Sequence, residues 1–388
     1  MSIAPRAVAR VIRSVLLVVA ALLAVSVPAS AATWTPYSPP IPAVVTEDAF
    51  FGVSCGATTS CTVAGQGYNG LWGALAESGS GTAWAFQTGV TRNPGPKNGL
   101  FRGVSCSAAT ACEAVGSYGT SGGVPAMMAQ RQSGTTWTLY NLGIPAGATR
   151  AELFGASCRS ASWCMAVGNK TVSGVGRPQA MRYNGSAWTD AGATSVSDST
   201  LNGVSCASTT TCVAVGYAGS GPAAQTWNGS TWTATAVPAV PGAYSTANLT
   251  GVSCVSATWC LATGSYKNSS GLWRPFADVW NGTAWTTTDG IPWSGNDHSN
   301  IEAEAFGISC VSTMECWIVG EGHYGSAITP WGVLWTGTTW AVGLLPTVSG
   351  ATVATLRSVS CTATNQCAAA GWSLPGGKYA GLTETLTP

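Results

Sequence analysis

The chain has 388 residues, and its 46% hydrophobic content excludes a disordered protein. Only 8% of the residues are charged, with 16 basic against 15 acidic side chains. Nucleic acids and anionic membrane surfaces require clustered lysine and arginine, so we expect neither as a partner.

The first 31 residues have the pattern of a secretory signal peptide. Three arginines precede an apolar run over residues 15–27, and a small-x-small cleavage signal follows at 29–31. The run is too short for a permanent membrane span, and no second stretch approaches that length. The sequence therefore predicts a signal peptide over 1–31, no membrane insertion, and a secreted, extracellular domain over 32–388.

A phrase close to Gly-Val-Ser-Cys-x5-Cys, followed by a short apolar segment that ends in glycine, occurs seven times. Its first copy covers residues 52–65. Successive first cysteines are 48 to 56 residues apart, and the seven copies use all 14 cysteines. Because the mature chain gives about 51 residues for each copy, the repeats leave no room for another domain.

A second phrase, aromatic-Asn-Gly-x-x-Trp or a close variant, follows each cysteine pair. Clear copies cover residues 183–188, 227–232, 280–285 and 335–340. Asn-Gly tolerates positive φ and is typical of a hairpin between aromatic strands. The Asn-Gly-Ser/Thr triplets also match the glycosylation acceptor pattern. We prefer the turn interpretation, because the triplets recur at one place in the repeat.

Each repeat then holds four short strands, and no stretch shows sustained helical periodicity. Four strands in a unit of this length are typical of a β-propeller blade. The last repeat lacks a fourth strand, whereas the segment 33–35 matches the fourth strands of other repeats. The sequence thus predicts an all-β, seven-bladed propeller with four antiparallel strands in each blade, in which the N-terminal strand closes the last blade.

The cysteine count, the export signal and the fixed spacing predict disulfides within the repeats. A zinc site at the cysteines would need further ligands, usually histidine, and the chain has only His298 and His323. We therefore predict no metal and no cofactor. The expected disulfides are Cys55–Cys61, Cys106–Cys112, Cys158–Cys164, Cys206–Cys212, Cys254–Cys260, Cys310–Cys316 and Cys361–Cys367.

The loops after the second and fourth strands share one face and vary in sequence, so we place any ligand site there. Aromatic side chains follow the second strands, and one more lies in the longest loop. They either stack on a ligand such as a sugar or pack between blades, and we prefer packing for the periodic ones. The candidate ligand-binding residues are Tyr118, Tyr217, Tyr266, Trp293 and Trp372.

The segment 289–324 gathers scarce acidic and histidine side chains on this face. Two carboxylates suit acid–base hydrolysis of a glycosidic bond, and a histidine with Tyr or Glu suits proton abstraction beside a uronate carboxylate. Asp297, Glu302 and Glu304 also suit calcium, although no Asp-x-Asp-x-Asp loop is present. An ordinary solvated loop is the interpretation we prefer. The weak catalytic candidates are Asp297, His298, Glu302, Glu321, His323 and Tyr324.

The whole mature chain resembles secreted bacterial, actinobacterial-type seven-bladed propellers built from Cys-x5-Cys repeats. The Gly-x-x-Trp turn also distantly resembles the Asp-box turn of sialidase-like propellers. The Asp-box aspartate is replaced here by Tyr183, Trp227, Trp280 or Trp335, and the scattered arginines do not form the triad of a sialidase. The resemblance therefore implies the architecture and not sialidase activity.

Together these features predict a secreted, monomeric, non-catalytic binding module that recognises an extracellular glycan or protein through its variable-loop face. Low charge, aromatic side chains and a disulfide-braced scaffold favour recognition over chemistry. One alternative is a polysaccharide-active enzyme, a glycoside hydrolase or lyase, that uses the 289–324 segment. The other is a structural protein of the cell surface.

Overall fold

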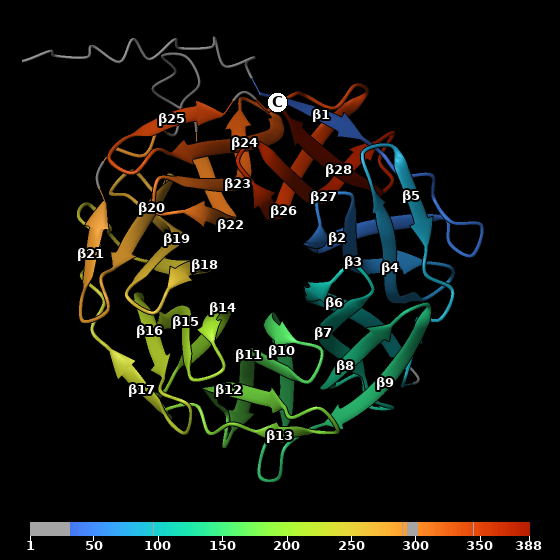
Figure 1. Cartoon of the computed structure of the whole chain (residues 1–388), viewed down its shortest axis with the longest axis horizontal. Coiled ribbons are helices and arrows are strands. Elements are labelled where there is room, and N and C mark those ends of the chain that lie inside the picture. Colours follow the sequence, from blue (N-terminus) through green and yellow to red (C-terminus); the bar gives the residue numbers. More distant parts are fainter. Residues whose placement is uncertain (1–31, 96, 289, 293–301, 344) are drawn as a thin grey trace, which may run out of the picture. The chain divides into compact units, whose positions relative to one another are not determined.

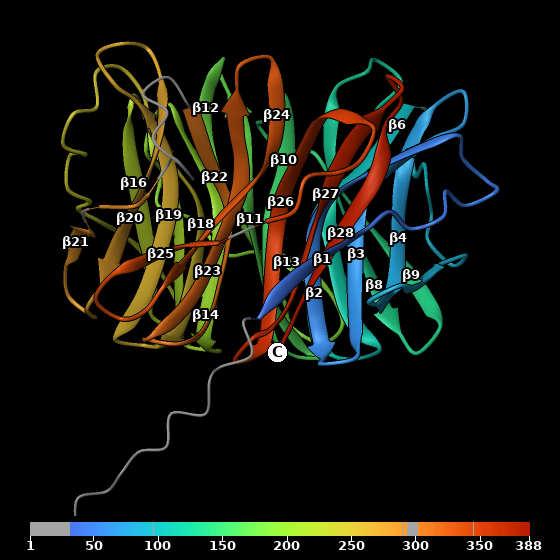
Figure 2. The same ribbon diagram turned by 90° about the horizontal axis from the view of Figure 1, so that it is seen from above.

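The computed structural model describes residues 32–388 except 96, 289, 293–301 and 344. All regular secondary structure in these residues is β-strand, in four-stranded antiparallel sheets arranged around a common centre (Figure 1). One parallel pair, Ile328 with Val353, also joins the last two of these sheets. The strands run between two faces that carry the turns and loops (Figure 2). This arrangement confirms the seven-bladed β-propeller. No helix in the described part of the chain is long and apolar enough to cross a membrane.

The blades take their strands in chain order from the centre outward. Blade 1 has β2 (Glu47–Ala57), β3 (Ser60–Tyr68), β4 (Trp72–Ser80) and β5 (Ala83–Phe86). Blade 2 has β6 (Lys97–Ala108), β7 (Ala111–Gly119), β8 (Pro125–Ser133) and β9 (Thr136–Gly143). Blade 3 has β10 (Arg150–Ser160), β11 (Trp163–Val172), β12 (Val175–Tyr183) and β13 (Trp188–Asp190). Blade 4 has β14 (Ser199–Ser208), β15 (Thr211–Ala218), β16 (Gly221–Trp227) and β17 (Trp232–Thr235).

The remaining three blades follow the same order. Blade 5 has β18 (Ala247–Ser256), β19 (Trp259–Lys267), β20 (Trp273–Trp280) and β21 (Trp285–Thr288). Blade 6 has β22 (Glu302–Ser312), β23 (Glu315–Tyr324), β24 (Ala327–Trp335) and β25 (Trp340–Gly343). Blade 7 has β26 (Ala351–Ala363), β27 (Gln366–Pro375), β28 (Ala380–Thr387) and, as its outer strand, β1 (Thr33–Tyr37).

The N-terminal strand closes the ring as the sequence predicts. β1 pairs antiparallel with β28 and places Trp34 opposite Leu386. The Trp34 side chain is buried and meets Trp317 of blade 6 edge to face, with 5.2 Å between ring centroids. The innermost strands contact one another in chain order, and β26 contacts β2. The first and last parts of the domain therefore share one blade.

The serine of each Gly-Val-Ser-Cys phrase links its blade to the next. The backbone N–H of Cys106 donates to Ser54 Oγ, and the pattern continues from blade to blade until the N–H of Cys55 donates to Ser360 Oγ. All seven bonds measure 2.9 to 3.0 Å. Each bond satisfies a backbone N–H group that the inner edge of the sheet leaves unpaired. Such a hydrogen bond stabilises the fold by about 1 kcal/mol. The serine column is therefore a circular interblade seam.

The seven predicted disulfides are all present. Each joins directly opposed residues of the first two strands, with Cα atoms 3.8 to 4.0 Å apart, and no described cysteine is free. The Asn-Gly phrases form the turns between the third and fourth strands. Gly185 has a φ of 99°, and Asn184 Oδ1 accepts the N–H groups of Ser186 and Ala187. The asparagine side chain thus stabilises the turn.

One position of the third strand is polar in several blades. It faces the second-strand residue that lies two positions after the second cysteine of the repeat. In blades 2 and 4 it is Gln130 and Gln225, whose amides exchange two hydrogen bonds with the backbone of Thr91 and Thr194 in the adjoining loops. In blade 7 it is Glu384, which is fully buried. Burial raises the pKa of Glu384 to about 8, so this carboxyl is protonated at neutral pH.

We expect this carboxyl to make the domain less stable as pH rises. Because its pKa is higher in the folded than in the unfolded chain, its contribution is complete below about pH 4.5 and is lost as pH rises toward 8. Glu384→Gln gives blade 7 the glutamine that blades 2 and 4 have at the same position. The free energy of unfolding of this variant, relative to the parent, should rise by about 2–4 kcal/mol between pH 5 and pH 8.

Urea unfolding at the two pH values measures this difference. Asp190→Asn is the control, because its carboxylate is half exposed, and its replacement should change the free energy of unfolding little at either pH. An equal effect of Glu384→Gln at both pH values would show that the buried carboxyl does not titrate as described.

Candidate functional site

A bulge in each innermost strand turns one side chain toward the central channel. In blade 3 the pairing of β10 with β11 shifts between Leu153 and Gly155, so Phe154 has no opposite residue. Bulges re-aim side chains in this way. The same shift occurs in all seven blades at the residue before the Gly-Val-Ser-Cys phrase. The channel residues are Phe51, Arg102, Phe154, Asn202, Thr250, Phe306 and Arg357.

Six of these residues line a cavity of about 290 Å³. Asn202 instead donates to Asn248 Oδ1 and to the backbone oxygen of Leu249. The two guanidinium groups lie against aromatic faces. Arg102 is 5.4 Å from the Phe154 ring centroid, and Arg357 is 4.1 Å from that of Phe306. Cation–π contacts of this kind hold a guanidinium in place and leave its N–H edges available.

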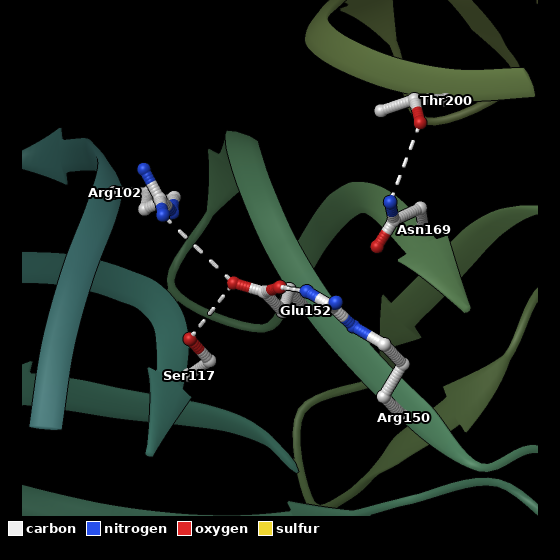
Figure 3. Close-up of polar contacts among 6 residues, drawn as sticks. All are labelled: Arg102, Ser117, Arg150, Glu152, Asn169 and Thr200. Atoms are coloured by element: carbon white, nitrogen blue, oxygen red, sulfur yellow. Dashed lines mark hydrogen bonds and ion pairs between the residues drawn. The ribbon is translucent and has the colours of Figure 1, made fainter. Parts of the chain in front are cut away.

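At the mouth of the channel over blades 2 and 3, two arginines lie on either side of one glutamate, and Figure 3 shows these three side chains. Arg102 and Arg150 both contact the carboxylate of Glu152, and Arg102 does so at 3.9 Å. Ser117 Oγ also donates to this carboxylate, at 3.3 Å. The Glu152 side chain is only 9% exposed, whereas those of Arg102 and Arg150 are 40% and 47% exposed. One buried negative charge therefore positions two accessible positive charges.

Three further basic residues lie on the same face of blades 2 and 3. Lys97 begins β6, Lys170 lies near the end of β11 and pairs with Asp190 at 3.7 Å, and Arg177 lies near the start of β12. All three lie at the variable-loop ends of their strands. We call Lys97, Arg102, Arg150, Lys170 and Arg177 the basic sector. Lys97 also borders a cavity of about 470 Å³ between blades 1 and 2.

The mouth over blade 6 has a different composition. Glu304 on β22 lies directly opposite Glu321 on β23, and Glu302 lies opposite His323. His323 Nε2 is 3.4 Å from Glu321 Oε1, and Arg357 is 3.9 Å from Glu321 Oε2. Burial, reinforced by Glu321, raises the pKa of Glu304 to about 7. We call Glu304, Glu321 and His323 the acidic sector.

The predicted aromatic residues do not share one orientation. Tyr217 and Trp372 are five residues after the second cysteine of their repeats, and each lies opposite a threonine of the inner strand. Tyr118 and Tyr266 are six residues after it, so their side chains leave the opposite face of the sheet. Tyr118 is buried, donates to Asn141 Oδ1 at 2.6 Å and borders the 470 Å³ cavity.

The remaining predicted site residues contact neighbouring aromatic side chains, are exposed, or lie outside the described residues. Tyr266 meets Phe276 edge to face at 6.2 Å. Trp372 meets Tyr379 at 5.1 Å and lies 5.9 Å from the Arg357 guanidinium. Tyr324, at the end of β23, is exposed. Trp293, Asp297 and His298 lie outside the described residues.

Sequence reasoning missed the bulge position. Its residue type changes from blade to blade, whereas the next residue is glycine in six repeats and Ser358 in the seventh, and the serine before the first cysteine occurs in all seven. This variation beside nearly constant neighbours is the signal that distinguishes the bulge position. Phe51, Arg102, Phe154, Phe306 and Arg357 all occupy this column of the repeat. Glu152 and Glu304 share another column, six residues before the first cysteine. Aligning the seven repeats column by column would have found both sets.

No protein-family model and no curated protein matches the chain. Solved β-propeller structures match its fold. YCF48 from Cyanidioschyzon merolae is similar over 92% of this chain and 99% of its own, with 14% identity and a TM-score of 0.52. U3-55K is similar over 90% of this chain and 98% of its own, with 8% identity and a TM-score of 0.54. A structure of YCF48 bound to D1 peptide covers 92% of this chain and 95% of its own, with 13% identity and a TM-score of 0.50. These likenesses concern the fold alone.

Proposed function

We propose that this protein is a secreted, monomeric, non-catalytic binding module that recognises an extracellular glycan or protein segment bearing carboxylate groups. The signal-peptide pattern of residues 1–31 and the seven disulfides support export to an oxidising environment. The resemblance to secreted bacterial Cys-x5-Cys propellers agrees with export. The variable-loop face of the propeller is the binding face.

The observation that carries this proposal is the pair of accessible guanidinium groups held by Glu152. Each guanidinium has five N–H donors in a fixed fork and binds a carboxylate through two parallel bonds. Glu152 lies between Arg102 and Arg150 and contacts one nitrogen of each guanidinium (Figure 3). It therefore holds both groups in place, and each guanidinium has further N–H groups for a ligand. A ligand carboxylate that enters from the channel mouth completes the charge balance of this cluster, which otherwise is positive by one unit.

The channel itself supplies shape and stacking. Its 290 Å³ cavity admits only a small part of a ligand. The larger cavity beside Tyr118, Lys97 and Gln66 extends the site between blades 1 and 2. A chain-like ligand that reaches from this cavity to the channel mouth meets polar, aromatic and basic groups, and a glycan with repeated uronate units fits this set of groups.

Oligogalacturonate is the probe for this proposal, because it presents a carboxylate on every sugar. We expect the mature protein to bind oligogalacturonate. The affinity should fall about tenfold or more in Arg102→Gln and in Arg150→Gln, because each variant lacks a guanidinium that pairs with a sugar carboxylate. Arg159→Gln is the matched control, because Arg159 lies beside the cysteine turn on the other face. Isothermal titration gives the affinities.

Two further probes and one enzyme assay separate the alternatives. Methyl-esterified oligogalacturonate tests the need for the carboxylate, and poly-L-glutamate tests whether an acidic protein segment replaces the glycan. A reducing-sugar assay on the same polysaccharides tests the enzyme alternative, which the proximity of Glu304 and Glu321 favours. Equal binding of the ester and the acid, or unchanged affinity in both arginine variants, would contradict the proposal.

A further inference from the structure

The acidic sector combines three side chains that carry metal-binding atoms. Glu304 and Glu321 are directly opposed across β22 and β23, and His323 is two residues beyond Glu321 on the same strand. Side chains two residues apart on a strand leave the same face of the sheet. One donor atom from each residue lies within 4.8 Å of the other two. The bulge at Phe306, two residues after Glu304, sets this register and so brings the three groups together.

Arg357 holds the Glu321 carboxylate in place but contacts only one of its two oxygens. Arg357 approaches Glu321 Oε2 at 3.9 Å, whereas Glu321 Oε1 faces His323 Nε2 at 3.4 Å. The oxygen on the histidine side is therefore free of the guanidinium. The Glu321 side chain is 12% exposed and that of His323 is 31% exposed, so the cluster is sheltered and still open to an ion from solvent.

We propose that Glu304, Glu321 and His323 form a site for a divalent transition-metal ion, with Zn²⁺ as the ion that the donors fit. One imidazole nitrogen and two carboxylate oxygens are a zinc ligand set of the kind that leaves a position open for water or a ligand group. Calcium takes six to eight oxygen ligands, and these side chains supply two carboxylates and a nitrogen. The donor set therefore selects zinc over calcium.

This site is independent of the basic sector, because it lies in blade 6 and uses none of the residues proposed to bind carboxylates. A bound ion also changes the role of the cluster. With both carboxylates coordinated, Glu304 and Glu321 are not a free acid–base pair, and the positive ion offers a second anchor for an anionic ligand at the channel mouth.

Titration of tag-free mature protein, previously freed of metal by a chelator, tests the site. We expect one Zn²⁺ per chain by isothermal titration and a visible absorption band with Co²⁺. Glu321→Gln and His323→Ala should each weaken Zn²⁺ binding tenfold or more, because each removes a ligand outright. Glu315→Gln is the matched control, since Glu315 begins the same strand as Glu321 at the opposite, cysteine-turn end and is not one of the three donors, and it should bind as the parent does.

The outcomes are separable from effects on folding and from the proposed function. Circular dichroism and the melting temperature without metal identify any variant that fails to fold. Zn²⁺ should raise the melting temperature of the parent and of Glu315→Gln, but not that of His323→Ala. Absence of Zn²⁺ binding in the parent, unchanged binding in both ligand variants, or tighter binding of Ca²⁺ than of Zn²⁺ would overturn the proposal, whatever the result with oligogalacturonate.

Discussion

Gly216→Ala should destabilise the domain by about 3 kcal/mol or more, because a methyl group has no space at this position. A Cβ on Gly216 would lie 1.9 Å from the backbone oxygen of Thr200 and 3.0 Å from the Cα of Leu201. These atoms belong to the bulged inner strand and cannot move aside as a side chain does. The glycine that ends each cysteine phrase has the same contact, at 1.8 to 2.0 Å, in every blade.

Gly221→Ala is the matched control in the same blade. Gly221 begins β16, has no positive φ, and a Cβ there would meet no atom within 4 Å. Alanine at an unstrained strand position is neutral or stabilises slightly, because it restricts the unfolded chain. Urea unfolding of the two variants beside the parent measures the contrast. Similar free energies of unfolding for Gly216→Ala and Gly221→Ala would show that the bulge does not pack as described.

Removal of residues 32–37 should have an effect of similar size, because it deletes the strand that closes the ring. The truncation removes the buried Trp34 side chain and the pairing of β1 with β28. Loss of one large buried aromatic side chain costs about 3–5 kcal/mol. It also exposes the edge of β28, and an unpaired edge strand promotes association between chains. We expect a lower midpoint of unfolding and light scattering from oligomers.

A chain that lacks only Pro388 controls for shortening at a terminus. Pro388 is exposed and lies outside β28, so its removal should change neither the midpoint nor the scattering. If the chain without residues 32–37 unfolded at the same urea concentration as the parent and stayed monomeric, the N-terminal strand would not be needed to close the ring.

The architecture was predictable because the repeat constrains it at every level. Seven cysteine pairs of identical spacing allow one periodic pairing, and the missing fourth strand of the last repeat has its match at Trp34. The turn at Asn184 follows from the known tolerance of Asn-Gly for positive φ. The serine seam was not predicted, because the partner of Ser54 is a backbone group of the next blade and leaves no mark in its own repeat.

The site was less predictable, because it depends on single-residue register. Tyr118 and Tyr217 look equivalent in the sequence, but a difference of one residue places them on opposite faces of their sheets. The opposition of Glu304 and Glu321 likewise depends on the bulge before Gly307. Whether the predicted aromatic residues contact a ligand stays a prediction, as do the roles of Asp297 and His298.

The central claim is that ligands bind at the channel mouth on the variable-loop face, where Glu152 positions two arginines. A crystal structure of residues 32–388 with trigalacturonate tests it most directly. The account predicts a sugar carboxylate in contact with the guanidinium of Arg102 or Arg150. Sugar bound instead along the cysteine turns or the Asn-Gly turns of the opposite face would contradict it.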